Sequence, residues 1–189
     1  MKPLPKILLA LTAVAALSVA CPAKANLITN PGFETGDFTG WTAGAGASVV
    51  GTSNGVSPHS GSFQAKVFPL SLAVISQTLA TMAGQSYTVS FWTAASANPF
   101  QAGLGVFWGG STSFNITYPA GNTPYTEFTF NATASSASTN LAFSFGASGN
   151  LFLDDVSVTP AGVPDAGSTL PLLGFASLGL VALRRKLGC

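Results

Sequence analysis

The chain has 189 residues, of which 47% are hydrophobic and only 7% charged, and its formal net charge is +1. That positive value comes from the two ends, because residues 26–162 contain one lysine and five acids, a net charge of −4 with the histidine neutral. Nucleic-acid-binding domains present a basic surface, so this composition excludes that class of partner. Both cysteines, Cys21 and Cys189, lie outside the central part, which therefore folds without an internal disulfide.

The chain begins like an export signal. Two lysines precede an apolar run over residues 7–19, and the Ala-Lys-Ala of residues 23–25 supplies the small residues that signal peptidase requires. We therefore expect residues 1–25 to be a helical secretory signal peptide that signal peptidase removes. A lipoprotein signal with Cys21 as the lipidated residue is the alternative, but Ser18 fits poorly at the aliphatic position three residues before such a cysteine.

Residues 26–160 are expected to form one β-rich domain. Large apolar residues alternate with small or hydroxylated ones in 87–91, 128–130 and 141–145, a period of two that is typical of strands with one buried face. Turn sequences rich in Gly, Pro and Asn recur between such runs. The pattern predicts an all-β fold, an antiparallel jelly-roll β-sandwich. The expected strands are 27–29, 46–51, 63–68, 73–79, 86–94, 103–108, 112–117, 125–131, 140–145 and 151–158.

Landmarks in this domain follow a recognisable order. They are the opening Asn-Leu-Ile-Thr-Asn-Pro-Gly-Phe-Glu of 26–34, Gly40-Trp41, His59-Ser-Gly61, the Tyr-Thr-Val-Ser-Phe-Trp of 87–92 and the Leu-Phe-Leu-Asp-Asp-Val of 151–156. Together they resemble the galactose-binding-like jelly rolls, a group that includes many carbohydrate-binding modules. The resemblance covers essentially all of 26–160. It implies that the first and last strands lie side by side, and that a structural calcium ion sits there, held by Glu34, Asp154 and backbone carbonyls.

A separate argument favours the same metal. Calcium prefers six to eight oxygen ligands, and three of the five acids of this domain, Glu34, Asp154 and Asp155, stand in the terminal segments that such a fold brings together. Adjacent strand residues point to opposite faces, so only one of the two aspartates should face inward, and the landmark pattern favours Asp154. The alternative is that these acids are solvated charges that protect a sheet edge.

Catalytic patterns are sparse. His59 is the only histidine and follows a proline in a turn-like stretch. Glu34 and Glu127 could be considered as a glycosidase pair, but Glu127 stands at an outward strand position where a solvated charge is ordinary. We expect His59 to be a surface turn residue and the protein not to be an enzyme.

Two tryptophans are the candidates for stacking on a sugar. Trp92 is out of phase with Tyr87, Val89 and Phe91, so it stands on the other face of its strand if those three are core. Trp108 follows Phe107, and one of that pair must also face away from the other. An exposed indole is a suitable platform for a pyranose, although packing beneath loops or in a second layer is the alternative. Trp41 is expected in the core.

The C-terminal part is built like a membrane address. Residues 161–169 form a linker with the sorting motif Val163, Pro164, Asp165, Ala166 and Gly167, and residues 170–187 form an expected transmembrane sorting helix with a basic stop at Arg184, Arg185 and Lys186. The apolar run 170–183 would span roughly 21 Å as a helix against a hydrocarbon core of about 30 Å.

The motif, apolar helix and basic tail resemble the VPDSG variant of the PEP-CTERM sorting signals of Gram-negative bacteria. Ala166 stands where that variant usually has serine. The resemblance implies membrane insertion, cleavage by an exosortase-type protease and delivery to the cell surface or exopolysaccharide. A C-terminal anchor that is never cut is the alternative. We therefore expect an exported surface or matrix protein whose non-catalytic module binds polysaccharide. The first alternative is a structural or adhesive surface protein without a sugar ligand, and a secreted hydrolase ranks behind it.

Overall fold

The computed structural model of the chain describes residues 25–68, 73–98, 102–146 and 149–162. The predicted signal segment up to residue 24, the sorting motif and the C-terminal apolar segment lie outside these residues. Within the described ranges the chain forms strands and turns, and no helix there is long and apolar enough to cross a membrane.

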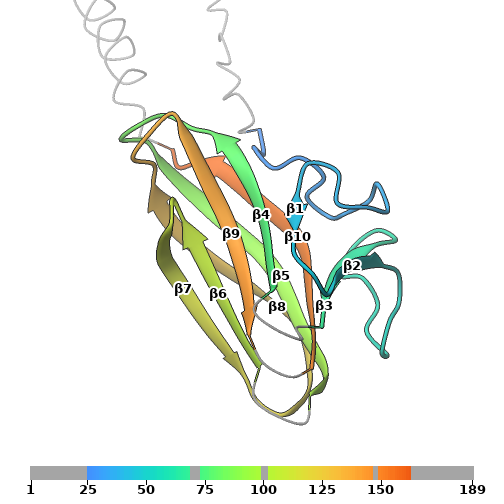
Figure 1. Cartoon of the computed structure of the whole chain (residues 1–189). Coiled ribbons are helices and arrows are strands. Elements are labelled where there is room, and N and C mark those ends of the chain that lie inside the picture. The colour runs from blue at the N-terminus through green and yellow to red at the C-terminus, as the bar shows by residue number, and fades with distance from the viewer. Residues whose placement is uncertain (1–24, 69–72, 99–101, 147–148, 163–189) are drawn as a thin grey trace, which may run out of the picture.

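Two five-stranded antiparallel sheets make up the described part of the chain (Figure 1). Sheet 1 has the order β1 (Thr42–Ala43), β4 (Ala73–Ala80), β9 (Ser138–Gly146), β6 (Ala102–Trp108) and β7 (Ser111–Tyr118). Sheet 2 has the order β2 (Ala47–Val50), β3 (Gln64–Val67), β10 (Asn150–Pro160), β5 (Ser86–Asn98) and β8 (Gly121–Thr133). The predicted all-β jelly-roll sandwich is confirmed.

The core lies between the two sheets because alternate residues of each strand point inward. On β6 the inward residues are Leu104, Val106 and Trp108, and all three are buried. Aromatic side chains take part in this core, and Phe91 meets Phe143 edge to face with ring centres 5.1 Å apart. Trp41 is buried as expected, with its ring 5.4 Å from that of Phe33.

The first and last segments of the domain lie side by side, as the resemblance implied. The Leu27 N–H donates to the Val158 carbonyl at 2.9 Å, and the Asn26 amide group donates to the Val156 carbonyl at 3.1 Å. Residues 27–29 nevertheless form no strand, so that prediction was wrong, because only isolated bonds connect them to β10. The described chain begins and ends at the same end of the sandwich (Figure 1).

The loop of residues 51–63 covers part of the outer face of sheet 2. The Gln64 side chain donates to the carbonyls of Gly51 and Val56 at 2.9 and 3.0 Å, and the Ser96 hydroxyl donates to the Asn54 carbonyl at 2.7 Å. As a result Gln64 has no exposed surface although it points out of the sandwich. A polar side chain buried in this way has to be hydrogen-bonded, which fixes the loop on the sheet.

Candidate functional site

A groove crosses the outer face of sheet 1. Alternation along β6 directs Gly103, Gly105 and Phe107 outward, since their neighbours point into the core. The strand register sets Gly103 between Gly146 of β9 and Thr117 of β7. Because Gly103 on β6 and Gly146 on β9 carry no side chain, a hollow of about 350 Å³ lies beside them.

One wall of the groove carries an aromatic ring and the other carries polar groups. A Cβ atom built on Gly105 would lie 3.1 Å from a ring carbon of Phe107 and 3.3 Å from Asn115 Oδ1. The phenyl ring and the amide therefore meet above this glycine. Thr117 and Ser144 add hydroxyl groups to the lining. An apolar ring beside a few directed polar groups is the usual composition of a small-molecule site.

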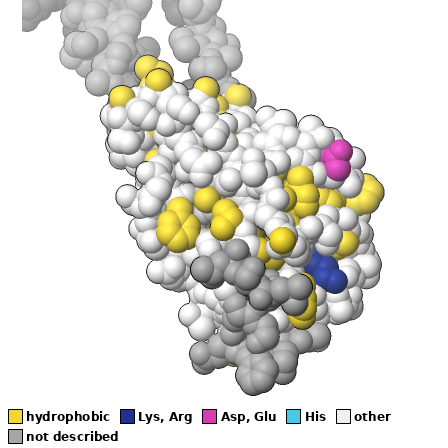
Figure 2. All heavy atoms as spheres, in the orientation of Figure 1, with side chains coloured by type: hydrophobic (Ala, Val, Ile, Leu, Met, Phe, Trp, Pro, Cys, Tyr) yellow, Lys and Arg dark blue, Asp and Glu magenta, His cyan; other side chains and the backbone are white. Residues whose placement is uncertain are grey.

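The groove is electrically neutral. Its lining among the described residues contains no charged side chain: Gly103, Leu104, Gly105, Phe107, Asn115, Ile116, Thr117, Ser144 and Gly146. Figure 2 views this face, and the acidic and basic side chains visible on it lie toward the right-hand side, away from β6 and β9. A ligand held here would be recognised by ring contact and hydrogen bonds rather than by charge.

Trp108, the second candidate for stacking on a sugar, lies in the core, which is the packed alternative. Trp108 is only 6% exposed, its indole N–H donates to the Thr133 carbonyl at 3.1 Å, and its ring packs beside Tyr87. Its neighbour Phe107 is the residue of the pair that faces outward, and sequence reasoning missed it. The signal was the alternation Gly-Leu-Gly-Val-Phe-Trp over 103–108, in which the glycines mark an outer face that Phe107 shares.

Trp92 does stand on the outer face of sheet 2, opposite the face of the groove. It is half-buried because the His59 ring stacks on it, with ring centres 3.7 Å apart and an interplanar angle of 15°. One face of the indole is therefore occupied by a side chain of the 51–63 loop. The Tyr125 ring contacts the His59 ring edge-on, with ring centres 5.5 Å apart.

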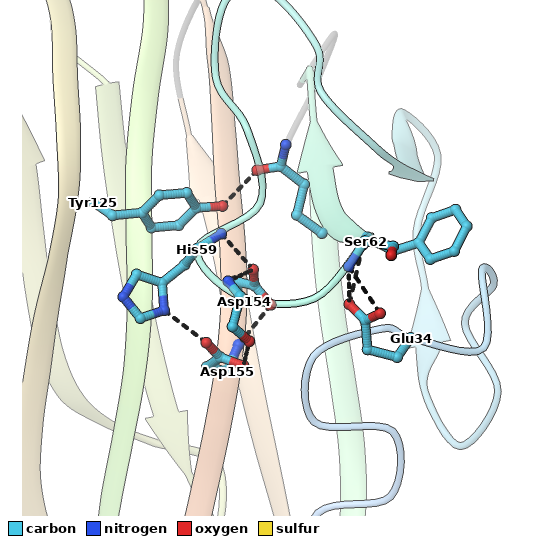
Figure 3. Close-up of polar contacts among 9 residues, drawn as sticks. Glu34, His59, Ser62, Tyr125, Asp154 and Asp155 are labelled. Atoms are coloured by element: carbon cyan, nitrogen blue, oxygen red, sulfur yellow. Dashed lines mark hydrogen bonds and ion pairs between the residues drawn. The ribbon is translucent and has the colours of Figure 1, made fainter.

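Carboxylates hold the end of this loop (Figure 3). Asp154 Oδ2 accepts the His59 backbone N–H at 2.8 Å, and Asp155 Oδ2 lies 2.6 Å from His59 Nδ1. Glu34 accepts the N–H groups of Ser62 and Phe63 at 2.9 and 3.0 Å. Acidic side chains from the first turn and from the last strand thus hydrogen-bond to the same segment, 59–63, from two sides.

Both aspartates hydrogen-bond to this segment because β10 is irregular at this point. The β10–β5 register shifts between Asp154 and Ser157, and Asp155 has a φ of 46°. The expectation that strand alternation would separate the two aspartates was therefore wrong, since a bulge turns Asp155 toward the same loop. Asp154 has no exposed surface, but it lies beneath the loop rather than in the inter-sheet core.

Burial raises the pKa of Asp154 to about 7, and the nearby Asp155 carboxylate adds to the rise. The backbone N–H groups of Asp155, Ser60 and His59 donate to the Asp154 carboxylate. These hydrogen bonds stabilise its charged form and so lower the pKa in part. The Tyr125 hydroxyl, which donates to Gln64 Oε1 at 2.5 Å, also has a raised pKa because it is buried and near both aspartates.

The three acids expected near a calcium ion surround one glycine. A Cβ atom on Gly32 would lie 3.2 Å from Asp155 Oδ1, 3.5 Å from Asp154 Oδ1 and 3.6 Å from Glu34 Cγ. Both aspartates present a carboxylate oxygen to this space, whereas Glu34 presents its Cγ and its carboxylate accepts the N–H groups of Ser62 and Phe63. The described residues contain no group of three or more His, Cys, Asp or Glu side chains already set at metal-binding distance. Calcium therefore stays a prediction.

The cluster around His59 is not arranged as a hydrolytic triad. The Ser60 hydroxyl donates to Asp155 Oδ1 at 2.7 Å, so serine and histidine share the aspartate instead of bonding to each other. Glu127 is exposed on β8, as expected, and pairs in register with Trp92.

Known proteins support both resemblances. The family described as "Carbohydrate binding domain" matches residues 25–158, and the VPDSG-CTERM motif matches residues 162–187. No curated protein matches the chain.

Solved structures show the same fold at low sequence identity. TmCBM61, solved with β-1,4-galactotriose, has 22% identity and a TM-score of 0.55 over 72% of this chain and 99% of its own. The CBM22-1 xylan-binding domain of Xyn10C from Paenibacillus barcinonensis has 18% identity and a TM-score of 0.57, with 76% and 99% covered. The K1 cleaved adhesin domain of Lys-gingipain from Porphyromonas gingivalis has 15% identity and a TM-score of 0.57, with 69% and 96% covered. On the match over residues 25–158, this chain belongs to the carbohydrate binding domain family and carries a VPDSG-CTERM motif.

Proposed function

We propose that the domain binds a neutral polysaccharide in the groove of sheet 1 and does so without catalysis. The observation that carries the proposal is the outward row of Gly103, Gly105 and Phe107 beside Asn115. A pyranose ring can lie on the phenyl face while its hydroxyls bond to the amide of Asn115 and to the hydroxyls of Thr117 and Ser144. Two structural neighbours, one solved with a galactotriose and one named as a xylan-binding domain, support a search among such glycans.

The test fills the groove without disturbing the fold. Among the described residues, a Cβ atom on Gly103 would meet two carbonyl oxygens, at 3.7 and 3.9 Å, so Gly103→Val fits an extended strand and places its methyl groups in the hollow. Thr78→Val is the matched control, since Thr78 is exposed on the same sheet outside the groove lining. On an array of neutral and uronic-acid glycans, we expect the wild type and Thr78→Val to bind neutral glycans and Gly103→Val to lose at least about tenfold in affinity. Equal binding by all three would refute the groove as the site.

We also propose that the chain is exported and held at the cell envelope through its C-terminal segment. The VPDSG-CTERM match over residues 162–187 supports this, and the basic cluster that follows the apolar run agrees with it. Cleavage by an exosortase-type protease would then release the domain to the surface or to exopolysaccharide. Mass spectrometry of the protein from its producer should find a C-terminus near Thr169. A chain that still ends at Cys189 would favour the uncut anchor.

We propose calcium as a structural ion held by Glu34 and Asp154. The ion would neutralise a buried carboxylate whose pKa is raised by burial, and it would tie the first turn to β10. We expect the melting temperature to rise on addition of calcium and to fall with EDTA, and Asp154→Asn to abolish the difference. An equal melting temperature in calcium and in EDTA would leave these carboxylates as hydrogen-bond anchors of the 59–63 segment alone.

A further inference from the structure

A second hollow lies between the free edges of the two sheets. β7 ends sheet 1 and β8 ends sheet 2, and the space between them has a volume of about 400 Å³. Its lining among the described residues combines aromatic and small polar side chains: Trp108, Gly109, Ser111, Ser113, Phe130, Asn131, Ala132, Thr133 and Ser135. We call this the edge cleft. It is separate from the groove, because the two share no lining residue.

A hydrogen bond between the sheets, a tight hairpin and small side chains border the edge cleft. The Trp108 indole N–H donates to the Thr133 carbonyl, which links β6 of sheet 1 to β8 of sheet 2 at the cleft. Gly109 and Gly110 form a tight hairpin with φ of 60° and 86°, and a Cβ on Gly110 would meet nothing within 4 Å. Small residues line most of this space, and the larger Phe130 at its border stacks on Phe114 with ring centres 6.1 Å apart.

A bulge shapes the wall that β7 contributes. The register between β6 and β7 passes from Val106 opposite Phe114 to Phe107 opposite Thr112, so Ser113 is the additional residue of a β-bulge. Bulges redirect side chains and are common beside functional sites. Here the irregularity places an exposed serine at the cleft, next to Ser111.

We propose that the edge cleft is a second glycan-binding site, so that one domain holds two polysaccharide segments. The inference rests on the proposed function, because it assigns to the cleft the same class of neutral ligand. The chemistry matches that of the groove: a half-buried ring, Phe130, lies beside serine and threonine hydroxyls and the Asn131 amide, without a charged lining residue. Phe107 and Trp108 are consecutive on β6 and point to opposite faces, so the two sites use opposite faces of this strand.

A domain with two such sites would cross-link polysaccharide chains. Linking through two sites turns weak single contacts into stable bridging, because the second binding step occurs at a high effective concentration. The proposed role of the exported protein then extends from attachment to a polysaccharide to organising a matrix of it.

The experiment counts sites and then blocks them one at a time. The full chain, solubilised, is titrated calorimetrically with xylotriose, cellotriose, mannotriose and β-1,4-galactotriose, and mixed with the corresponding soluble polymers while light scattering is recorded. Ser113→Tyr fills the edge cleft, and Thr129→Tyr, an exposed position on β8 outside the cleft lining, is its control. Gly103→Val fills the groove.

We expect two trisaccharides per wild-type chain and one for either blocked variant, with scattering by the polymer at least about tenfold lower for each blocked variant. Thr129→Tyr should behave as wild type. One trisaccharide per wild-type chain, with Ser113→Tyr unchanged and Gly103→Val inactive, would refute the second site and leave the proposed function intact. Failure of the wild type with every sugar would refute the proposed function itself.

Discussion

Phe107 and Trp92 are both aromatic residues on outer sheet faces, but their surroundings give them different roles. Phe107 lines an open hollow beside Asn115, whereas Trp92 is covered by the His59 ring at 3.7 Å. The Trp92 ring, stacked on His59, is therefore part of the packing of the 51–63 loop. A ring beside an open hollow is available to a ligand.

Exchanging each ring for alanine should separate these roles. We expect Phe107→Ala to weaken glycan binding about tenfold, equivalent to about 1.4 kcal/mol, with little effect on stability. Trp92→Ala should leave binding unchanged and lower the free energy of unfolding by about 1 kcal/mol, because it removes the stacked pair with His59. Calorimetric titration and urea unfolding of both variants check this. Loss of binding in Trp92→Ala alone would restore Trp92 as the sugar platform.

The raised pKa of Asp154 predicts an unusual pH dependence of the stability. Its pKa lies near 3.8 in the unfolded chain and is raised to about 7 in the folded one, so the folded state binds the proton more tightly between these values. Stability contributed by Asp154 is therefore present in full below about pH 4 and lost as the pH rises to about 7. The pKa of Asp37 is lowered by its hydrogen bonds to Thr39 and Thr35, so Asp37 changes the stability only at pH values below this range.

We expect the melting temperature in EDTA to fall between about pH 4.5 and about pH 7.5 and Asp154→Asn to flatten that fall. Differential scanning calorimetry at several pH values measures both. A variant whose melting temperature follows the wild-type pH profile would show that Asp154 does not titrate in this range.

At the scale of elements, the loop 51–63 shows how acids position a segment that no strand pairing holds. Gly61 has a φ of 62°, and a Cβ there would overlap the Glu34 carboxyl group. Glycine is thus required twice, by the backbone conformation and by the close approach of Glu34. Gly55 in the same loop has a φ of 77°, but a Cβ there would meet nothing within 4 Å.

Alanine at these two glycines should therefore differ in effect. Both substitutions impose a positive φ on a residue with a Cβ, which costs on the order of 1 kcal/mol. Only Gly61→Ala also displaces the Glu34 carboxylate from the N–H groups of Ser62 and Phe63, so we expect it to cost about 2 kcal/mol more than Gly55→Ala. Urea unfolding of the two variants gives the difference. Equal costs would mean that Glu34 does not hold the loop.

The strands and the fold class were predictable from sequence because alternation reports one buried face directly. Trp92 on an outer face followed from the same reasoning, Trp41 in the core followed from its place in the opening motif, and both positions are confirmed. The contacts that build the sites were not predictable, since they join distant segments: His59 reaches Asp155 across 96 positions. The bulge at Asp155 was also invisible, because a positive φ at an aspartate leaves no pattern in the sequence.

At the scale of the whole molecule, both described chain ends leave the sandwich at one end (Figure 1). The Gly109 N–H donates to the Asn140 carbonyl at 2.9 Å, which sets the β6–β7 hairpin beside the start of β9, whereas Gly103 pairs with Gly146 at the finish of that strand. The groove thus extends toward the end remote from residue 162. A domain held through its C-terminal segment would present this part of the groove away from the envelope.

The most direct measurement of the central claim is a residue-resolved NMR titration of the ¹⁵N-labelled protein with the neutral oligosaccharide that binds best. We predict that the largest saturable shifts fall on the amides of Gly103, Gly105, Phe107, Asn115 and Thr117, and that they vanish in Gly103→Val. Shifts centred instead on Trp92 and His59, with these five amides unmoved, would contradict the account.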